Sequence, residues 1–314
     1  MNAVSNTGTS AVAGTALPER PIARKTRAGA PAPGFAGPGH TAMEVVRPDA
    51  LARTDPFVLL MDDTLDFAPG QPVGEAHPHA GLETVTLVLE GSLDDADEGL
   101  LQTGDLAWMT AGRGLVHNEH VKATGHARIL QLWVALPRSK RDGDPDLQVV
   151  PLETLPLRSE PGVQARLYSG STGTLTSPTR NRVPMTIVDF LLAPGASTTQ
   201  ALPGAYTGFL YVIDGSLRAG HETLSSGDIG WLERVPHDAT RLGLEAGSSG
   251  ARVVLYAGRP LDEPIMQHGP FVAGSREELA AYYRAYSAGT FRRISELGRD
   301  GSRETYASPY SARR

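Results

Sequence analysis

The chain has 314 residues and no cysteine, which excludes disulfides, thiolate metal ligands and a cysteine nucleophile. Its 35 acidic residues against 29 basic ones give no general electrostatic attraction to nucleic acid or to an anionic membrane. No apolar run approaches about 18 residues, and residues 1–20 do not resemble a secretory signal, so we expect a cytoplasmic protein without a membrane span.

The N-terminal segment, residues 1–38, is rich in Ala, Gly, Thr, Ser and Pro. Such a composition buries too little apolar surface to offset the entropy that is lost when the chain becomes ordered. We therefore expect a disordered tail. We expect its basic residues to be solvated; these are Arg20, Arg24, Lys25 and Arg27.

From residue 41 onward, apolar runs of strand length alternate with Gly, Pro and Asp. Examples are "FVLLMDD" from residue 57, "ETVTLVLEG" from residue 83, and "RVVLYAGRP" from residue 252. This pattern predicts an all-β sandwich or barrel. One short helix is predicted over residues 275–288, where Ser275 and Glu278 match a capping box and Gly289 follows the last turn.

An internal repeat predicts two copies of one barrel. The segment "LVLEGSL" from residue 87 matches "YVIDGSL" from residue 211, and "GDLAWM" from residue 104 matches "GDIGWL" from residue 227. The two matches lie 124 and 123 residues apart, so they keep almost the same register. We therefore predict one barrel over residues 39–150 and a second over residues 151–314, which also holds the helix and a tail.

Two pairs of polar residues mark a candidate metal site. Residues two apart in a strand share a face, so His77 and His79 would point inward together with Glu83 and the apolar residues that follow. A second pair, His117 and Glu119, comes after the next hairpin. Three imidazoles and a carboxylate leave one or two positions open on a six-coordinate ion, which suits Fe(II), Mn or Ni. The alternative is that these are ordinary polar residues at the mouth of a strand.

Four segments follow one another along the chain: "HPHAGLETVTLVLEG", "GDLAWMTAGRGLVHNE", "LQLWVALP" and "EPIMQHGPFV". In this order and spacing they resemble the signature segments of the pirin family, a family of two-cupin proteins, and the likeness runs from about residue 40 to residue 292. The resemblance implies a bicupin, with two double-stranded β-helix (jelly-roll) barrels in one chain. It also implies that the first cupin binds one iron ion through His77, His79, His117 and Glu119.

The resemblance implies that Glu83 lies beside the metal ligands, where it could accept a proton or hydrogen-bond to a ligand. Fe(II) is the expected cofactor, and Mn, Ni, Co, Cu and Zn are the alternatives. In the second copy the repeat places Ala201, Pro203 and Thr207 at the positions of His77, His79 and Glu83, so we expect no metal there. Residues that depart from the family pattern flank the pocket and bear on substrate preference; they are Ala80, Leu82 and Asn118.

The function that the resemblance implies is that of a quercetin 2,3-dioxygenase, which opens a flavonol-like aromatic substrate with O2. Glu119 or Glu83 would take the proton of the substrate hydroxyl. Apolar residues expected to wall the pocket are Leu82, Val85, Met109 and Leu115. The alternatives are a non-catalytic, iron-dependent redox-sensing regulator that acts through protein contacts, and an inhibitor of a metabolic enzyme. We expect a monomer without direct nucleic-acid contact.

Overall fold

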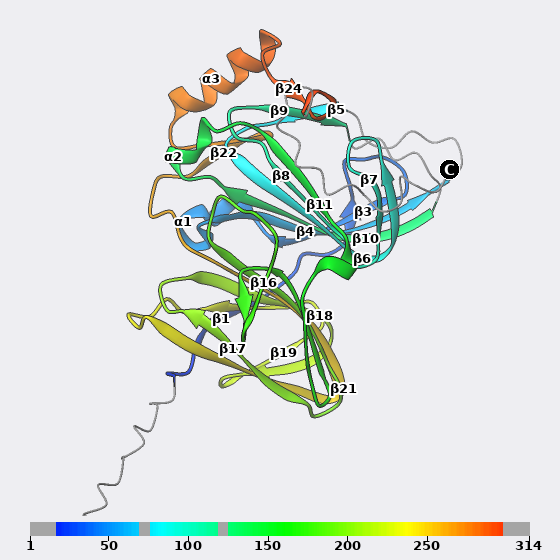
Figure 1. Ribbon diagram of the computed structural model, residues 1–314, viewed down its shortest axis with the longest axis vertical. Coiled ribbons are helices and arrows are strands. Elements are labelled where there is room, and N and C mark those ends of the chain that lie inside the picture. Colours follow the sequence, from blue (N-terminus) through cyan, green and yellow to red (C-terminus); the bar gives the residue numbers. More distant parts are fainter. Residues whose placement is uncertain (1–16, 69–75, 119–124, 298–314) are drawn as a thin grey trace, which may run out of the picture.

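The computed structural model describes residues 17–68, 76–118 and 125–297, and these form two β-barrels stacked one on the other (Figure 1). The first barrel contains an eight-stranded sheet and two further strands, β5 and β9. The strands are β2 (Ala32–Pro33), β3 (His40–Val46), β4 (Phe57–Phe67), β5 (Ala76–His79), β6 (Leu82–Asp95), β7 (Gly99–Gln102), β8 (Leu106–Thr110), β9 (Leu115–Asn118), β10 (Gly125–Ala135) and β11 (Asp146–Val150).

The second barrel is built on a nine-stranded sheet. Its strands are β1 (Ile22–Arg27), β12 (Leu157–Glu160), β13 (Val163–Ser169), β16 (Met185–Leu192), β17 (Ser197–Pro203), β18 (Thr207–Ala219), β19 (Glu222–Ser225), β20 (Asp228–Leu232) and β21 (Ala239–Gly258). A small hairpin, β14 (Ser171–Thr172) and β15 (Leu175–Thr176), stands apart. The all-β prediction is therefore confirmed, with one barrel for each copy of the repeat.

The repeated sequence segments form equivalent hairpins. Val85 pairs with Trp108 in the first barrel, as Phe209 pairs with Trp231 in the second. The repeated glycines, Gly91 and Gly215, both have a φ of 74°. A Cβ atom at either position would lie about 2 Å from a carbonyl oxygen of the adjacent strand, so only glycine fits.

The two barrels share one hydrophobic core. It includes Val85, Leu87 and Leu132 from the first barrel and Phe209 and Tyr256 from the second. Polar contacts cross the same interface: Tyr211 donates a 2.7 Å hydrogen bond to Asp62, whose carboxylate also accepts two hydrogen bonds from Arg128. A separate apolar core fills the second barrel alone.

The expectation of a disordered tail is wrong for residues 17–38. β1 pairs antiparallel with β20 of the second barrel, and β2 pairs with β3 of the first. The basic residues find partners there: Arg27 pairs with Asp228, and the Arg24 guanidinium lies 4.6 Å from the centre of the Trp231 ring. The composition argument failed because an edge strand can form on an existing sheet with little apolar surface of its own. Residues 1–16 lie outside the described residues.

The C-terminal segment crosses in the opposite direction, to the first barrel (Figure 1). There β24 (Arg292–Arg293) pairs parallel with β9, and Ile294 and Leu297 pack against Met109 and Leu115. The same segment holds the hairpin of β22 (Met266–His268) and β23 (Phe271–Ala273) and the helix α3 (Arg276–Ser287). The N-terminal strand β1 thus completes the second barrel, and the C-terminal segment with β24 completes the first.

The predicted terminal helix is confirmed as α3, with Ser275 as its N-cap. Ser275 Oγ accepts a 3.2 Å hydrogen bond from the Glu278 amide, while the Glu278 carboxylate accepts from the Gly274 amide. The other helices are short: α1 (Leu51–Thr54) and α2 (Arg138–Arg141). In the described part of the chain, no helix has the length and apolar character that a bilayer span requires.

Candidate metal centre

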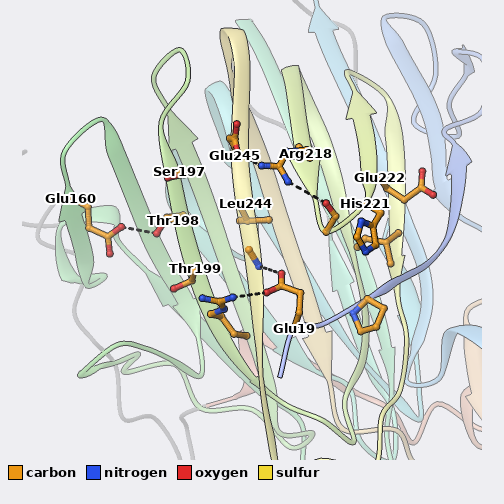
Figure 2. Close-up of a pocket in the computed structure, with 15 residues that line it drawn as sticks. Glu19, Glu160, Ser197, Thr198, Thr199, Arg218, His221, Glu222, Leu244 and Glu245 are labelled. Atoms are coloured by element: carbon orange, nitrogen blue, oxygen red, sulfur yellow. Dashed lines mark hydrogen bonds and ion pairs between the residues drawn. The ribbon is translucent and has the colours of Figure 1, made fainter. Parts of the chain in front are cut away.

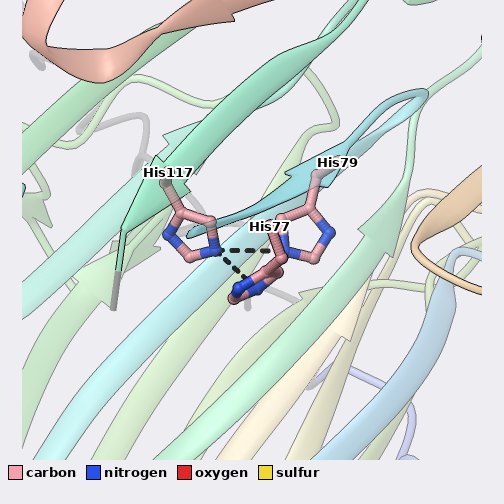
Figure 3. A group of neighbouring side chains, drawn as sticks. All are labelled: His77, His79 and His117. Atoms are coloured by element: carbon pink, nitrogen blue, oxygen red, sulfur yellow. Dashed lines mark hydrogen bonds between the residues drawn. The ribbon is translucent and has the colours of Figure 1, made fainter. Parts of the chain in front are cut away.

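Three histidine side chains converge at the end of the first barrel that lies away from the second barrel (Figures 1 and 3). β5 and β9 pair antiparallel, so that His77 lies directly opposite His117. His117 Nε2 is 2.8 Å from His77 Nε2 and 3.2 Å from His79 Nε2. The pairing of two short strands therefore brings three ring nitrogens to one point.

Gly81 separates this site from the long strand that follows it. Its φ is 75°, and a Cβ atom there would lie 1.8 Å from the Val272 carbonyl oxygen. The Gly81 amide donates to the Gly112 carbonyl, and the Val272 amide donates to the Ala80 carbonyl. β5 and β6 are consequently two strands with a turn between them, and side-chain alternation does not continue across Gly81.

Glu83 consequently lies on the other side of the barrel wall. It shares a face with Val85, which belongs to the core between the barrels. Its carboxylate accepts a 2.8 Å hydrogen bond from Thr110 Oγ1 and a 3.1 Å hydrogen bond from the Arg182 amide of the second half. This position does not support the expectation that Glu83 stands beside the histidines and accepts a proton there.

The four residues expected to wall a pocket are all buried in cores. Val85 lies in the core between the barrels, and Leu82 packs with Val58, Ala135 and Val272. Met109 and Leu115 are covered by the C-terminal segment. That segment comes from more than 170 residues away in the chain, so no local pattern could predict this cover.

Burial keeps two of the three imidazoles uncharged. Burial, together with the nearby His77, lowers the pKa of His79 to about 3, although the contact with the Pro270 carbonyl acts in the opposite direction. Burial and the neighbouring histidines likewise lower the pKa of His117 well below its usual value. At neutral pH these two side chains are neutral imidazoles, the form that binds a metal ion.

The donor set fits a metal ion. His79 Nδ1 lies 3.3 Å from the Pro270 carbonyl oxygen, which only accepts hydrogen bonds, so the ring proton belongs on Nδ1. The Nε2 lone pair of His79 then faces the other two rings. A backbone carbonyl that fixes the tautomer in this way is the usual support of a metal-binding histidine.

The expected fourth ligand, Glu119, lies outside the described residues. The strand that leads to it is described as far as Asn118, whose amide donates a 2.6 Å hydrogen bond to Asp97 Oδ2. Asp97 stands in the acidic hairpin tip between β6 and β7, and Asp95 Oδ1 accepts from the Asp97 and Glu98 amides. The hairpin tip therefore lies beside the end of β9 and is hydrogen-bonded to it.

The second barrel contains a guanidinium at the equivalent place. Ala201 and Pro203, which the sequence repeat places at the positions of His77 and His79, are exposed. The inward residue of β17 is Leu202, which lies opposite Thr240, so the sequence repeat was aligned one residue out of register on this strand. Arg20 is fully buried there, with Nη1 2.9 Å from the Gly204 carbonyl oxygen and 3.4 Å from Thr240 Oγ1. Within the described ranges, only the histidines of the first barrel form a group of three side chains that could hold a metal.

Two aromatic residues that the sequence did not single out flank the histidines. The Trp133 ring is 4.9 Å from the His79 ring and nearly perpendicular to it, and the Phe35 ring is 6.1 Å from the His77 ring. Trp133 could have been found from alternation, because it points opposite to Leu132 and Val134 of the shared core. Phe35 stands in a Gly- and Pro-rich segment without a periodic signal.

Apart from the histidine group, the surface of the second barrel carries a groove of about 690 Å³ (Figure 2). Its charged side chains are largely paired with one another, Arg241 with Glu19 and Arg218 with Glu245, while Glu160 accepts a hydrogen bond from Thr198. These ion pairs already neutralise both arginines of the lining. We therefore assign no ligand to this groove.

Two family models match the chain. One, described as Pirin, matches residues 39–134, and one, described as Pirin C-terminal cupin domain, matches residues 187–292. The chain belongs to the pirin family. The pirin of Homo sapiens is 38% identical over 248 residues, which cover 74% of this chain and 81% of the human protein. Pirin-1 of Arabidopsis thaliana is 34% identical over 239 residues, or 74% of this chain and 82% of that protein.

This pirin-family chain also resembles a solved structure of a quercetin 2,3-dioxygenase from Acinetobacter baumannii. The two are 26% identical with a TM-score of 0.79, over 87% of this chain and 98% of the other. The predicted family and the bicupin architecture are thus confirmed. The first cupin carries the histidine group, and the second holds Arg20 at the equivalent place.

Proposed function

We propose that the protein is a metal-dependent dioxygenase of the quercetin 2,3-dioxygenase type, acting on flavonol-like aromatic substrates with O2. The observation that carries the proposal is the convergence of three imidazole Nε2 atoms, at 2.8 and 3.2 Å, in the first cupin, with no second such group among the described residues. The likeness to the Acinetobacter baumannii quercetin 2,3-dioxygenase supports the substrate class.

The residues proposed to hold the metal are His77, His79, His117 and Glu119. Fe(II) is the first choice, and Mn, Ni, Co, Cu and Zn also suit nitrogen and oxygen ligands, so metal availability decides among them. When bound, such an ion supplies a Lewis acid that lowers the pKa of a coordinated hydroxyl group and a centre at which O2 can react.

The chain itself supplies ligand orientation and proton transfer. The Pro270 carbonyl fixes the tautomer of His79, as described above. Glu119 is the carboxylate proposed to accept the proton of the substrate hydroxyl, because Glu83 lies between the barrels, bonded to Thr110 and Arg182. The Trp133 ring lies 4.9 Å from the His79 ring and nearly perpendicular to it, so it packs against this histidine on the protein side.

The test is loss of a flavonol together with O2 uptake by the purified, Fe(II)-loaded protein. We expect activity in the wild type and a loss of at least a hundredfold in His79→Ala and in Glu119→Ala, with loss of metal in His79→Ala. Glu83→Gln is the matched control and keeps both metal and activity, since an amide oxygen can accept the hydrogen bonds that Glu83 accepts now.

Two results would contradict the proposal. The first is a metal-loaded wild type that consumes neither flavonol nor O2; if such a protein retained a protein partner on affinity capture, the redox-sensing regulator would be favoured instead. The second is an activity that persists in His79→Ala.

A further inference from the structure

Phe35 is the most exposed large apolar side chain in the described part of the protein, with 76% of its surface accessible. It stands at the candidate metal centre: its ring centre is 6.1 Å from that of His77, with the two planes at 78°. In the folded protein the ring also makes an edge-to-face contact with the His40 ring, whose centre is 5.4 Å away. Most of its surface is still accessible, so covering the ring with a bound apolar molecule would gain free energy.

The segment that carries Phe35 is tightly held. The Gly34 amide donates to the His40 carbonyl, the His40 amide donates to the Gly37 carbonyl, and the Ala36 amide donates to His40 Nδ1 at 3.1 Å. His40 itself is buried and pairs with buried Asp63 at 3.2 Å. A Cβ atom at Gly34 would lie 2.3 Å from the His40 ring, so the turn depends on close contact with that ring. The phenyl ring is exposed but anchored.

Phe35 is also the outer member of a row of rings. From Phe35 to His77, from His77 to His79 and from His79 to Trp133, the ring centres are 6.1, 4.9 and 4.9 Å apart. Neighbouring rings in the row are close to perpendicular, with interplanar angles of 77–82°. The imidazoles thus have one aromatic ring on the protein side, Trp133, and one on the solvent side, Phe35.

We infer that Phe35 is a specificity-determining residue that holds a planar aromatic substrate against the histidine group. A flat ring system placed over the imidazoles would cover the exposed phenyl ring and gain both apolar burial and an aromatic contact. This inference rests on the proposed function, since it names the residue that selects the substrate class for the same site. Phe35 touches no reacting atom, so its substitution changes substrate binding and not the chemical step.

The experiment compares Phe35→Ala and Phe35→Tyr with the wild type. Leu191→Ala is the matched control, because Leu191 is an exposed apolar side chain, 53% accessible, on β16 of the second barrel. Fe(II)-loaded proteins are titrated with quercetin without O2, and quercetin fluorescence or absorbance gives the Kd. Metal content and, with O2, KM and kcat are measured on the same preparations.

We expect Phe35→Ala to raise Kd and KM about tenfold, with kcat within about twofold of the wild type and metal content unchanged. Phe35→Tyr and Leu191→Ala keep the wild-type Kd within about threefold. A wild-type Kd in Phe35→Ala overturns the inference, and so does loss of metal in that variant, which would assign Phe35 to support of His77.

The two proposals fail in different ways. If the wild type binds quercetin through Phe35 but consumes no O2, the dioxygenase proposal fails and the inference stands. If the wild type and Phe35→Ala turn over quercetin with the same KM, the inference fails and the dioxygenase proposal stands. A wild type that binds no quercetin overturns the inference directly.

Discussion

At the scale of single residues, burial has opposite effects on the histidines and on Glu83. It lowers the pKa of His79 and of His117, because a buried imidazole resists protonation, and it raises the pKa of Glu83, because a buried carboxyl resists ionisation. The histidines are therefore ready ligands at neutral pH. Hydrogen bonds from Thr110 and from the Arg182 amide offset part of the cost of burying Glu83 in the interface between the barrels.

The lowered pKa of the histidines predicts that the metal-free protein loses stability in weak acid. Below about pH 6.5 an unfolded histidine binds a proton that buried His79, with a pKa of about 3, does not bind. More protons are then bound in the unfolded state, so the free energy of unfolding falls with falling pH, by about 1.4 kcal/mol per pH unit for each such histidine.

Chemical denaturation of the metal-free protein between pH 7 and pH 5 measures this slope. His79→Gln should reduce it, while His221→Gln, at an exposed position on the second barrel, should leave it unchanged. A free energy of unfolding that stays constant over this range in the wild type would show that the histidines do not resist protonation.

At the scale of elements, local sequence patterns correctly predicted those features that depend on residues close together in the chain. The alternating runs predicted the strands, the capping residues predicted α3, and the spacing of His77 and His79 predicted that they point the same way. The sequence pattern did not reveal the turn at Gly81, because a single glycine within an alternating run is compatible with one continuous strand. This error placed Glu83 beside the histidines.

The pairing of each chain end with the barrel more distant in sequence could not be predicted, for a different reason. β1 pairs with β20, about 200 residues further along, and β24 pairs with β9, about 180 residues back. Such contacts leave no periodic signal in either segment. The cover over Met109 and Leu115, the Pro270 contact to His79 and the burial of Arg20 all depend on them.

The N-terminal segment, from residue 17 to the end of β1, is predicted to stabilise the second barrel through Arg20. Its buried guanidinium donates to the carbonyls of Pro203, Gly204 and Tyr206. Arg20→Ala leaves these acceptors without their donor and should lower the free energy of unfolding by about 2–4 kcal/mol. Arg24→Ala, which removes an exposed contact to Trp231, should cost only about 0.5–1 kcal/mol.

Urea denaturation of the two variants and the wild type checks the difference. Equal losses in Arg20→Ala and Arg24→Ala would mean that the buried guanidinium contributes no more than an exposed one. That result would contradict the role given to Arg20.

At the scale of the whole molecule, two copies of one barrel differ in what fills their equivalent ends. The first holds three convergent imidazoles, and the second holds a guanidinium that donates to backbone carbonyls. The same scaffold therefore forms without the histidines, which shows that they are not required to build a barrel of this kind. The shared core keeps the two barrels in one body, with Glu83 and Tyr211 among its polar contacts.

The metal stoichiometry of the protein tests this account most directly. After reconstitution with Fe(II) and removal of free metal, elemental analysis should find one metal ion per chain in the wild type and in Glu83→Gln, and none in His117→Ala. A wild type without stoichiometric metal, or a His117→Ala variant that still holds one ion per chain, would contradict the assignment of the centre to the three histidines of the first barrel.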